Sequence, residues 1–332
     1  MRFLLSRWKI LAVAAGIAAA FGAPAALAQA YPSKPIRVIV PFPPGNAGDV
    51  TARAIGDKLS QRLGQPVIID NRAGAQGGIG VDAVAKAPPD GYTILVTSLS
   101  PVVITPSVSK NIPYDPLKDL APVAMIGYTG MILVASPQLP VNNVPELIAY
   151  VKANPGKVTY ASLGSGTLSM LAMEMFKRGS GVDVLHVPYK GSAQALTDLI
   201  GGQVTLMIDG MTSSYGQVKA GKLKAIAISA RNRSSFAPSL PTMSESGVAG
   251  LKDFDIAGWV GMLAPANTPK PVVDRLNSEV NLLLQQAEFK ERAGTAGLEL
   301  YPPATPDQFA GFIRNELTRY REVSKALNIE AP

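Results

Sequence analysis

The sequence contains no cysteine and a single histidine, and both absences remove kinds of active site. Without cysteine the 332-residue chain forms no disulfide framework, no thiolate zinc site and no cysteine nucleophile. With one histidine it cannot build a histidine-rich metal site, and a Ser-His-Asp triad would have to use His186. His186 lies in the apolar segment Leu185–Pro188, where a structural histidine is the more ordinary interpretation. We therefore expect no metal and no cofactor, and an enzyme is the least favoured class of function.

Charge is scarce as well. Charged residues make up 17% of the chain and hydrophobic residues 47%, which is the composition of a folded protein rather than a disordered one. The formal charge is +7, but Arg2, Arg7 and Lys9 all lie near the N-terminus, ahead of the mature chain proposed below. Without them 28 basic and 24 acidic residues remain, a net charge of +4. This excess can help to attract small anions, but it is too weak and too scattered to indicate a nucleic-acid partner.

The N-terminal segment has the pattern of a cleaved export signal. Three basic residues precede an apolar run, Ile10 to Phe21, and two small-x-small cleavage sites follow, at Ala26–Ala28 and Ala28–Ala30. The run is short for a membrane span of about 20 residues, so an uncleaved anchor is the less favoured alternative. We expect a signal peptide over residues 1–28, with cleavage after residue 28 or 30. The mature protein is then a soluble protein exported to a bacterial periplasm.

Strands and helices alternate through the mature chain. Apolar, β-branched runs predict strands at 36–40, 66–70 and 92–97, with helices between them, and this β-α-β-α-β order indicates a parallel sheet covered by helices. The pattern recurs, with predicted strands at 131–135, 158–161, 185–188, 204–208, 223–229 and 256–262, predicted helices at 144–153, 167–178 and 193–201, and three C-terminal helices at 271–286, 287–296 and 306–327. Two similar halves predict two lobes with a ligand cleft between them, at the carboxyl ends of parallel strands.

Two strand-loop-helix turns could bind an anion without a basic residue. They run from Pro41 to Asp49 and from Ala161 to Thr167, and each presents backbone N–H groups at a helix N-terminus. In the second turn two glycines allow a ligand to approach closely, and Ser165 and Thr167 add hydroxyl donors. The alternative is that both are ordinary turns with Asp49 and Thr167 as N-caps. Taken from the residues alone, the two interpretations are evenly balanced.

Other candidate residues carry weaker signals. Asp209 ends a predicted strand, where it either caps a turn or faces the cleft. Phe42 and Trp259 are aromatic residues in a loop or at a strand edge between the lobes; core packing is the default for both, and an apolar wall of the site is the alternative. Lys190 and Arg231 could attract anions, although most such residues are solvated surface charges.

Seven motifs in the mature chain resemble those of a known family. They are Tyr31–Gly45, Leu63–Gly74, Ala87–Leu95, Asn111–Asp119, Gly164–Thr167, His186–Gly191 and Gly258–Trp259. Their number and order make the chain similar to the substrate-binding receptors of tripartite tricarboxylate transporters, also called Bug proteins. The similarity covers essentially the whole mature chain.

The resemblance implies an α/β, type II-like periplasmic-binding-protein fold with two lobes, two crossover strands near Met131 and Trp259, and an interlobe cleft. Lobe 1 would comprise residues 31–130 plus 262–332, and lobe 2 residues 131–261. The resemblance also implies that a small carboxylate is held largely by backbone amides and bridging waters. The implied ligand-binding residues are Phe42, Pro43, Asn46, Asp49, Ser98, Gly164, Ser165, Gly166, Thr167 and Asp209, with Trp259 as a further candidate.

Two positions depart from the family's pattern. Asn46 and Ala47 stand in the first loop where relatives often have glycines, and Met170 stands where many relatives have histidine. The leading expected function is a monomeric receptor that delivers a dicarboxylate, tricarboxylate or acidic amino acid to a membrane permease. Two alternatives remain open: an orphan receptor that serves a membrane signalling partner, and an enzyme on the same fold.

Overall fold

The computed structural model describes residues 31–109, 111–295 and 297–329, so the expected signal peptide lies outside the described residues. The chain divides into two compact units, Met1–Ser33 and Lys34–Pro332, and all the strands, helices and cavities described below belong to the second. No helix in the described ranges is long and apolar enough to cross a membrane.

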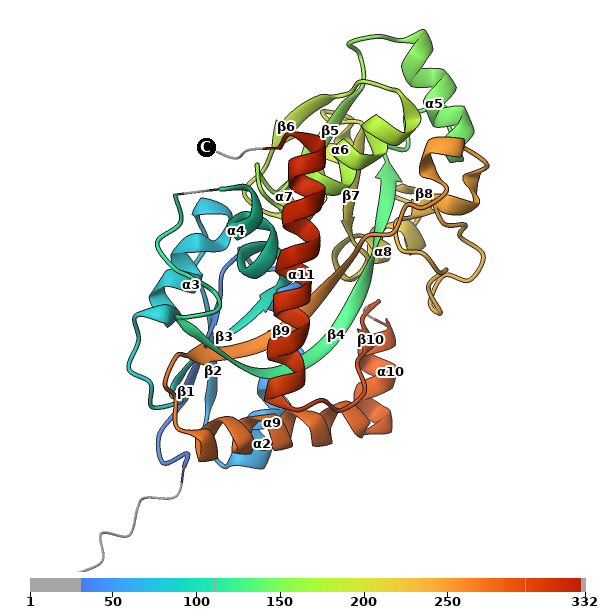
Figure 1. The fold of residues 1–332 in the computed structure, drawn as a ribbon. Helices are drawn as coiled ribbons and strands as arrows, with labels where there is room; N and C mark the ends of the chain where they lie inside the picture. The colour runs from blue at the N-terminus through green and yellow to red at the C-terminus, as the bar shows by residue number, and fades with distance from the viewer. Residues whose placement is uncertain (1–30, 110, 296, 330–332) are drawn as a thin grey trace, which may run out of the picture. The chain divides into compact units, whose positions relative to one another are not determined.

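A mixed β-sheet runs through the second unit (Figure 1). Its strands are β1 (Ile36–Val40), β2 (Val67–Asn71), β3 (Thr93–Ser98), β4 (Leu120–Ala135), β5 (Thr159–Ser162), β6 (Leu185–Pro188), β7 (Leu206–Gly210), β8 (Lys224–Ile228), β9 (Ala257–Pro265) and β10 (Glu299–Leu300). The strand order is β2-β1-β3-β9-β4-β7-β5-β6, and β8 and β10 also pair with β4. The sheet therefore has a parallel group at each end, β2-β1-β3 and β7-β5-β6, joined through β9 and β4.

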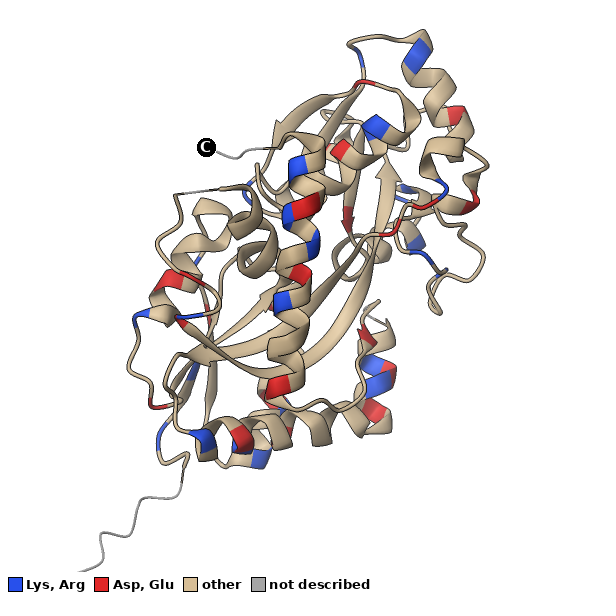
Figure 2. Cartoon of the chain, viewed as in Figure 1, with Lys and Arg blue, Asp and Glu red and all other residues tan. Residues whose placement is uncertain are grey.

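Helices connect the strands and cover the sheet. They are α2 (Ala47–Leu63), α3 (Gly78–Ala85), α4 (Thr105–Val108), α5 (Val144–Ala153), α6 (Leu168–Ser180), α7 (Ser192–Gly201), α8 (Met211–Lys219), α9 (Lys270–Gln285), α10 (Ala287–Thr295) and α11 (Pro306–Leu327). The last and longest, α11, runs along the molecule past the crossing of β4 and β9 (Figure 1). Its buried stripe, which includes Phe309, Ile313, Leu317 and Tyr320, joins the main hydrophobic core. Basic and acidic residues lie along the same helix (Figure 2).

Strands β4 and β9 are the two crossover strands of a two-lobed fold. The first part of β4 pairs with β9 in an antiparallel arrangement, from Leu120 to Gly130, and the last part pairs with β7, from Met131 to Ala135. Strand β9 in turn pairs with β3. The two strands therefore link the parallel groups, as the fold-class prediction requires. The predicted lobe boundaries, at 130/131 and 261/262, fall within these strands and stay a prediction.

Local sequence explains where the first helix begins and ends. Asn46 is the N-cap of α2, and its side chain accepts a hydrogen bond from the Asp49 amide. Gly64 ends the helix in the left-handed conformation, with φ of 67°, which glycine adopts without steric cost. Between these ends Ile55 and Leu59 lie on the buried face at helical spacing. The Asn46 cap thus sets the N-terminus of α2, which follows the carboxyl end of β1 after the loop 41–46.

Most predicted elements are present within a few residues of the expected bounds, but some are longer than predicted and others, including β10, are new. The strand predicted at 131–135 is only the end of the sixteen-residue β4. Its first part contains Pro122 and Gly127, and the pairing with β9 shifts register beside each of them, so the period-two pattern is broken. Helix α8 and the helical segment from Ser100 to Val108 were not predicted, because the first is rich in Ser, Thr and Gly and the second contains two prolines.

Candidate functional site

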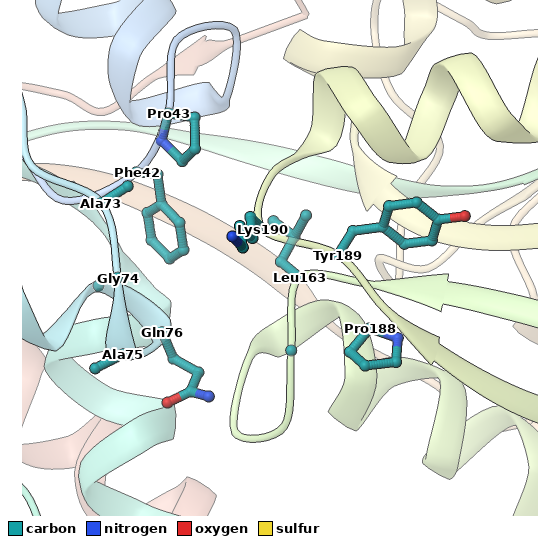
Figure 3. A pocket seen from close by; sticks show the side chains of 12 residues that line it. Phe42, Pro43, Ala73, Gly74, Ala75, Gln76, Leu163, Pro188, Tyr189 and Lys190 are labelled. Atoms are coloured by element: carbon teal, nitrogen blue, oxygen red, sulfur yellow. The ribbon is translucent and has the colours of Figure 1, made fainter.

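Two adjacent cavities, called here the inner and the outer chamber, lie at the carboxyl ends of β1, β3, β5 and β7. The inner chamber has a volume of about 60 Å³, and the outer chamber has a volume of about 440 Å³. Phe42 and Leu163 line both chambers, so the two are adjacent. Figure 3 shows the outer chamber, with Phe42 and Gln76 on one side and Leu163 and Tyr189 on the other. This is where small ligands bind in open α/β sheets.

Four helices in the described part of the chain begin at the inner chamber. Its lining includes Asn46 at the start of α2, Leu168 at the start of α6, Ser192 at the start of α7 and Gly210 just before α8. The N-terminus of a helix carries a partial positive charge and N–H groups without partners inside the helix. Among the described residues that line this chamber, none is lysine or arginine. An anion bound in this chamber would therefore be stabilised by helix N-termini rather than by a salt bridge.

The first loop is organised around Asp49. The carboxylate of this buried residue accepts hydrogen bonds from the Gly45 amide at 2.9 Å, from Arg53 at 3.0 Å and from Asn71 at 2.9 Å. Burial by itself raises the pKa of Asp49, but the hydrogen bonds from Arg53, Gly45 and Asn71 together hold it below its ordinary value. Asp49 is not among the residues that line either chamber. Its geometry is that of a residue that shapes the loop and positions Asn46.

The second loop is closed on itself. Gly164 and Gly166 have positive φ angles, of 106° and 84°. The Thr167 hydroxyl donates to the Gly164 carbonyl at 2.7 Å, and Thr167 is 1% exposed. Of the predicted residues in this loop, Gly164 lines the outer chamber, whereas Ser165, Gly166 and Thr167 are not among the lining residues. Thr167 occupies the N-cap position of α6 without a side-chain capping bond.

Hydrogen bonds join this second loop to the segment after β3. The Thr105 hydroxyl donates to the Gly166 carbonyl at 3.0 Å, and the Leu168 amide donates to the Ser100 hydroxyl at 3.0 Å. Ser100 and Leu168 also line the inner chamber. Because the two segments follow strands in different parallel groups, β3 and β5, these bonds link the two sides of the cleft.

Asp209 is the acidic residue of the inner chamber. It ends β7 and is 3% exposed. One carboxylate oxygen, Oδ1, accepts from the Ser192 hydroxyl at 3.0 Å. The other, Oδ2, has no hydrogen-bond partner among the described residues. Burial raises the pKa of Asp209 to about 6, and the hydrogen bonds from Ser192 and the Gly210 amide limit the rise.

The remaining predicted residues divide between lining and core positions. Phe42, Pro43 and Ser98 line one or both chambers. Trp259 is 1% exposed and is not among the lining residues; its ring packs edge-on against Phe309, with ring centres 5.4 Å apart. The preceding residue, Gly258, does line the inner chamber, as expected when successive residues of a strand face opposite sides.

Several lining residues were missed by sequence reasoning. Thr129 belongs to the part of β4 that was not predicted, and Ser213 belongs to the unpredicted helix α8. Ser100 follows the end of β3, and this position after a strand was the one available signal. Gln76 lies in the glycine-rich loop after β2, and its side chain faces the outer chamber (Figure 3).

His186 lies beside a serine that faces neither chamber. Its Nε2 lies 2.5 Å from Ser162 Oγ, and its ring stacks on Tyr160. Ser162, however, is fully buried, and it lines neither chamber. Burial also lowers the pKa of His186. Within the described ranges no group of three or more histidine and acidic side chains is placed to hold a metal ion.

Comparisons of the sequence and of the structure with known proteins point to one family. Residues 51–329 match the family model of the tripartite tricarboxylate transporter family receptor. The chain is 40% identical over 324 residues to protein BugT of Bordetella pertussis, and the match covers 97% of each chain. A Rhodopseudomonas palustris protein solved with adipate is 33% identical, with a TM-score of 0.87 over 90% of this chain and 99% of that one. MatC of the same organism, solved with bound malate, is 32% identical, with a TM-score of 0.83 over 88% and 99%.

Proposed function

The chain belongs to the family of tripartite tricarboxylate transporter receptors, and we propose that it is a periplasmic receptor that captures a small carboxylate and delivers it to a membrane transporter. Two similar structures hold adipate and malate, both of which are dicarboxylates. Export through a cleaved signal peptide is part of the same proposal, because a ligand in the periplasm can be reached only by an exported protein.

The observation that carries this proposal is the meeting of four helix N-termini at one small chamber without a basic side chain. A helix N-terminus stabilises a nearby anion by about 0.3–1 kcal/mol at an exposed site and up to about 2 kcal/mol where it is partly buried. Several such ends, with hydroxyl groups from Ser98 and Ser100, can hold a carboxylate without a counter-ion.

The dimensions of the cavity fit an elongated small acid. The inner chamber, at about 60 Å³, has room for one polar end of a ligand, and the outer chamber, at about 440 Å³, has room for the rest. Among the described residues that line the outer chamber, Lys190 is the one that carries a charge. A second carboxylate at the far end of the ligand would lie on the same side of the cleft as this cation.

Contacts across the cleft support a role in capture. The loops on its two sides are joined by the Thr105–Gly166 and Ser100–Leu168 hydrogen bonds, so a ligand in the inner chamber is enclosed while they are formed. A transporter that binds the enclosed form better than the open form would accept the loaded receptor selectively. This difference in affinity is what the proposed delivery step requires.

The first experiment is a ligand screen on the mature protein, residues 31–332, freed of bound molecules by denaturation and refolding. Thermal shift with mono-, di- and tricarboxylates, followed by calorimetry, should identify at least one acid that binds. A ligand at 100 times its Kd raises the free energy of unfolding by about 2.7 kcal/mol, which is large enough to detect. The receptor proposal fails if no acid shifts the melt and mass spectrometry finds no acid released from the protein as purified.

Delivery is tested in cells. Uptake of the identified acid, labelled with ¹⁴C, should fall when the gene is deleted and recover when it is restored. Unchanged uptake together with a changed transcriptional response to the acid would replace transport by the signalling alternative.

A further inference from the structure

The bond between His186 and Ser162 links edge strand β6 to the loop that walls both chambers. The strand register places His186 opposite Tyr160 of β5, and its ring stacks on that residue with ring centres 4.8 Å apart. Its Nε2 lies 2.5 Å from the Oγ of Ser162, the last residue of β5. The next residue, Leu163, lines both chambers, and Gly164 lines the outer one. His186 itself lines neither chamber, so its effect on a ligand must pass through this loop.

The Ser162 hydroxyl has two partners, and they fix the direction of its hydrogen. The Gly164 amide donates to Ser162 Oγ at 3.1 Å, so the oxygen is the acceptor in that bond. Ser162 is fully buried, and among the described residues His186 Nε2 is the one acceptor within hydrogen-bond distance of its hydroxyl. A bond in the reverse direction, from Nε2–H to Oγ, would leave a buried hydroxyl hydrogen without an acceptor, which is costly. The hydroxyl therefore donates to Nε2, and Nε2 carries no proton.

The surroundings of the ring favour its neutral form. Contact with Tyr160 and Ser162 removes part of the ring from water, and this burial lowers the pKa of His186. Of two charged groups on α6 that act on the ring, Glu174 raises this pKa and Lys177 lowers it. Glu174 also accepts hydrogen bonds from the Tyr160 hydroxyl at 2.7 Å and from Lys177 at 3.1 Å, so other donors already serve its carboxylate. The ring is therefore neutral at pH 7.5, with its proton on Nδ1.

Through Ser162 the histidine reaches the backbone of the second loop. Ser162 Oγ holds the Gly164 amide, and the Gly164 carbonyl accepts from the Thr167 hydroxyl at 2.7 Å. The Leu163 amide donates to the hydroxyl of Ser169, which lines the inner chamber, at 3.1 Å. Because glycine can adopt many backbone conformations, such bonds are what hold Gly164 at a φ of 106°.

We infer that His186 is a positioning residue of the receptor: its unprotonated Nε2 accepts the Ser162 hydroxyl, and Ser162 in that orientation holds the Gly164 amide. Without the Nε2 acceptor, the buried serine must adopt another χ1 rotamer to find an acceptor, which takes Oγ away from the Gly164 amide. The wall shared by the two chambers then loosens. This inference rests on the proposed function, because the loop is positioned for a ligand that His186 does not touch.

The first test is the tautomer of the ring, which can be observed without ambiguity because the chain contains one histidine. The sample is ¹⁵N-labelled, untagged and ligand-free mature protein, residues 31–332, at pH 7.5. A long-range ¹H–¹⁵N spectrum should show a protonated Nδ1 and an unprotonated Nε2. A proton on Nε2 would overturn the inference. Since no ligand is added, this result does not depend on the proposed function.

Two variants separate the acceptor from the ring. His186→Gln keeps an acceptor, the amide oxygen, and loses the ring, whereas His186→Phe keeps a ring that can stack on Tyr160 and loses the acceptor. Hydrogen-exchange mass spectrometry of the ligand-free proteins should show faster exchange of amides in segment 163–168 in the Phe variant and exchange like the parent's in the Gln variant. The opposite order would assign the effect to stacking and reject the inference. Because His186 is exposed, neither replacement opens a buried cavity, and melting curves check that both variants are folded.

Calorimetry at pH 7.5 with succinate, malate, adipate and citrate measures the consequence for ligand binding. For each acid that binds, His186→Phe should lower the affinity about two- to tenfold, as expected for loss of one hydrogen bond, and His186→Gln should leave it unchanged. In the Ser162→Ala background, which already lacks the hydroxyl, His186→Phe should cause no further loss.

These results separate the inference from the proposed function. If His186→Phe leaves the affinity unchanged, or lowers it further in the Ser162→Ala background, the inference is wrong while the carboxylate receptor stands. If the folded, ligand-free protein binds no acid at all, the proposed function is wrong, and the tautomer and the exchange rates still decide whether His186 positions the loop.

Discussion

Replacing Asp209 with asparagine tests how much the buried carboxylate destabilises the empty protein. The side chain has one oxygen without a partner and no neighbouring cation among the residues lining its chamber. The folded protein therefore raises the pKa of Asp209 from 3.8 to about 6. Above both values this difference corresponds to about 3 kcal/mol in the free energy of unfolding. Asparagine keeps the acceptor for the Ser192 hydroxyl and removes the charge, so a gain on the order of 1–3 kcal/mol is expected at pH 7.5.

The sign of the pH dependence follows from the raised pKa. Between about pH 4 and pH 6 the folded protein holds a proton on Asp209 that the unfolded chain has lost, so this residue's contribution to stability falls as the pH rises. Below about pH 4 the carboxyl is protonated in both states, and the cost disappears. The stability gained by Asp209→Asn should therefore be large at pH 7.5 and small at pH 4.

The assay is urea denaturation of ligand-free protein at both pH values, followed by tryptophan fluorescence and circular dichroism. Asp253→Asn serves as the control for loss of one exposed negative charge. A variant that is less stable than the parent at pH 7.5, or equally stabilised at both pH values, would refute the assignment of an unpaired buried charge. Because the protein is empty, the outcome does not depend on which acid it binds.

The remaining predictions concern closure of the cleft. A Cβ at Gly191 would lie 3.1 Å from Pro43 Cγ, so Gly191→Ala should weaken ligand binding roughly 5- to 100-fold in calorimetry. The control Gly216→Ala, where the added Cβ has no atom within 4 Å, should leave the affinity unchanged. Equal affinities of the two variants would show that Gly191 and Pro43 do not meet in the ligand-bound form. Thr105→Val removes one hydrogen bond across the cleft and should lower affinity roughly two- to tenfold, and a change below twofold would count against a role in closure. Trp259, the one tryptophan after the expected cleavage site, lies on crossover strand β9, so ligand binding should alter its fluorescence emission. A ligand that raises the melting temperature and leaves this emission unchanged would exclude Trp259 as a reporter of closure.

Much of the fold could be predicted from the sequence because its elements have strong local signals. The apolar run at Ile36–Val40 formed β1 as predicted, and the helix predicted at 306–327 has those bounds. The family resemblance, carried by motifs in order along the chain, was confirmed by the family match, and the predicted fold class was confirmed with it. Such signals depend on residues close together in sequence, so they can be recognised without knowledge of distant contacts.

The candidate site was predictable only in part. Phe42, Asn46 and Asp209 were predicted as ligand-binding residues, and all three line the inner chamber. Asp49 and Thr167 were predicted in the same way, but in the structure their polar atoms form hydrogen bonds within their own loops. Sequence position alone does not distinguish these cases, because a residue at a loop tip faces either the ligand or its own backbone.

Composition and local pattern determined that this chain has no cysteine chemistry, alternates strands with helices and places lysine-free loops before helices. Only the tertiary structure decided that four helices begin at one chamber and that Asp209 and Asn46 face it with unpaired atoms. The physical reason is the sheet. Pairing of β4 with β9 and β7 brings together strand ends that lie more than a hundred residues apart, and no local pattern encodes that distance.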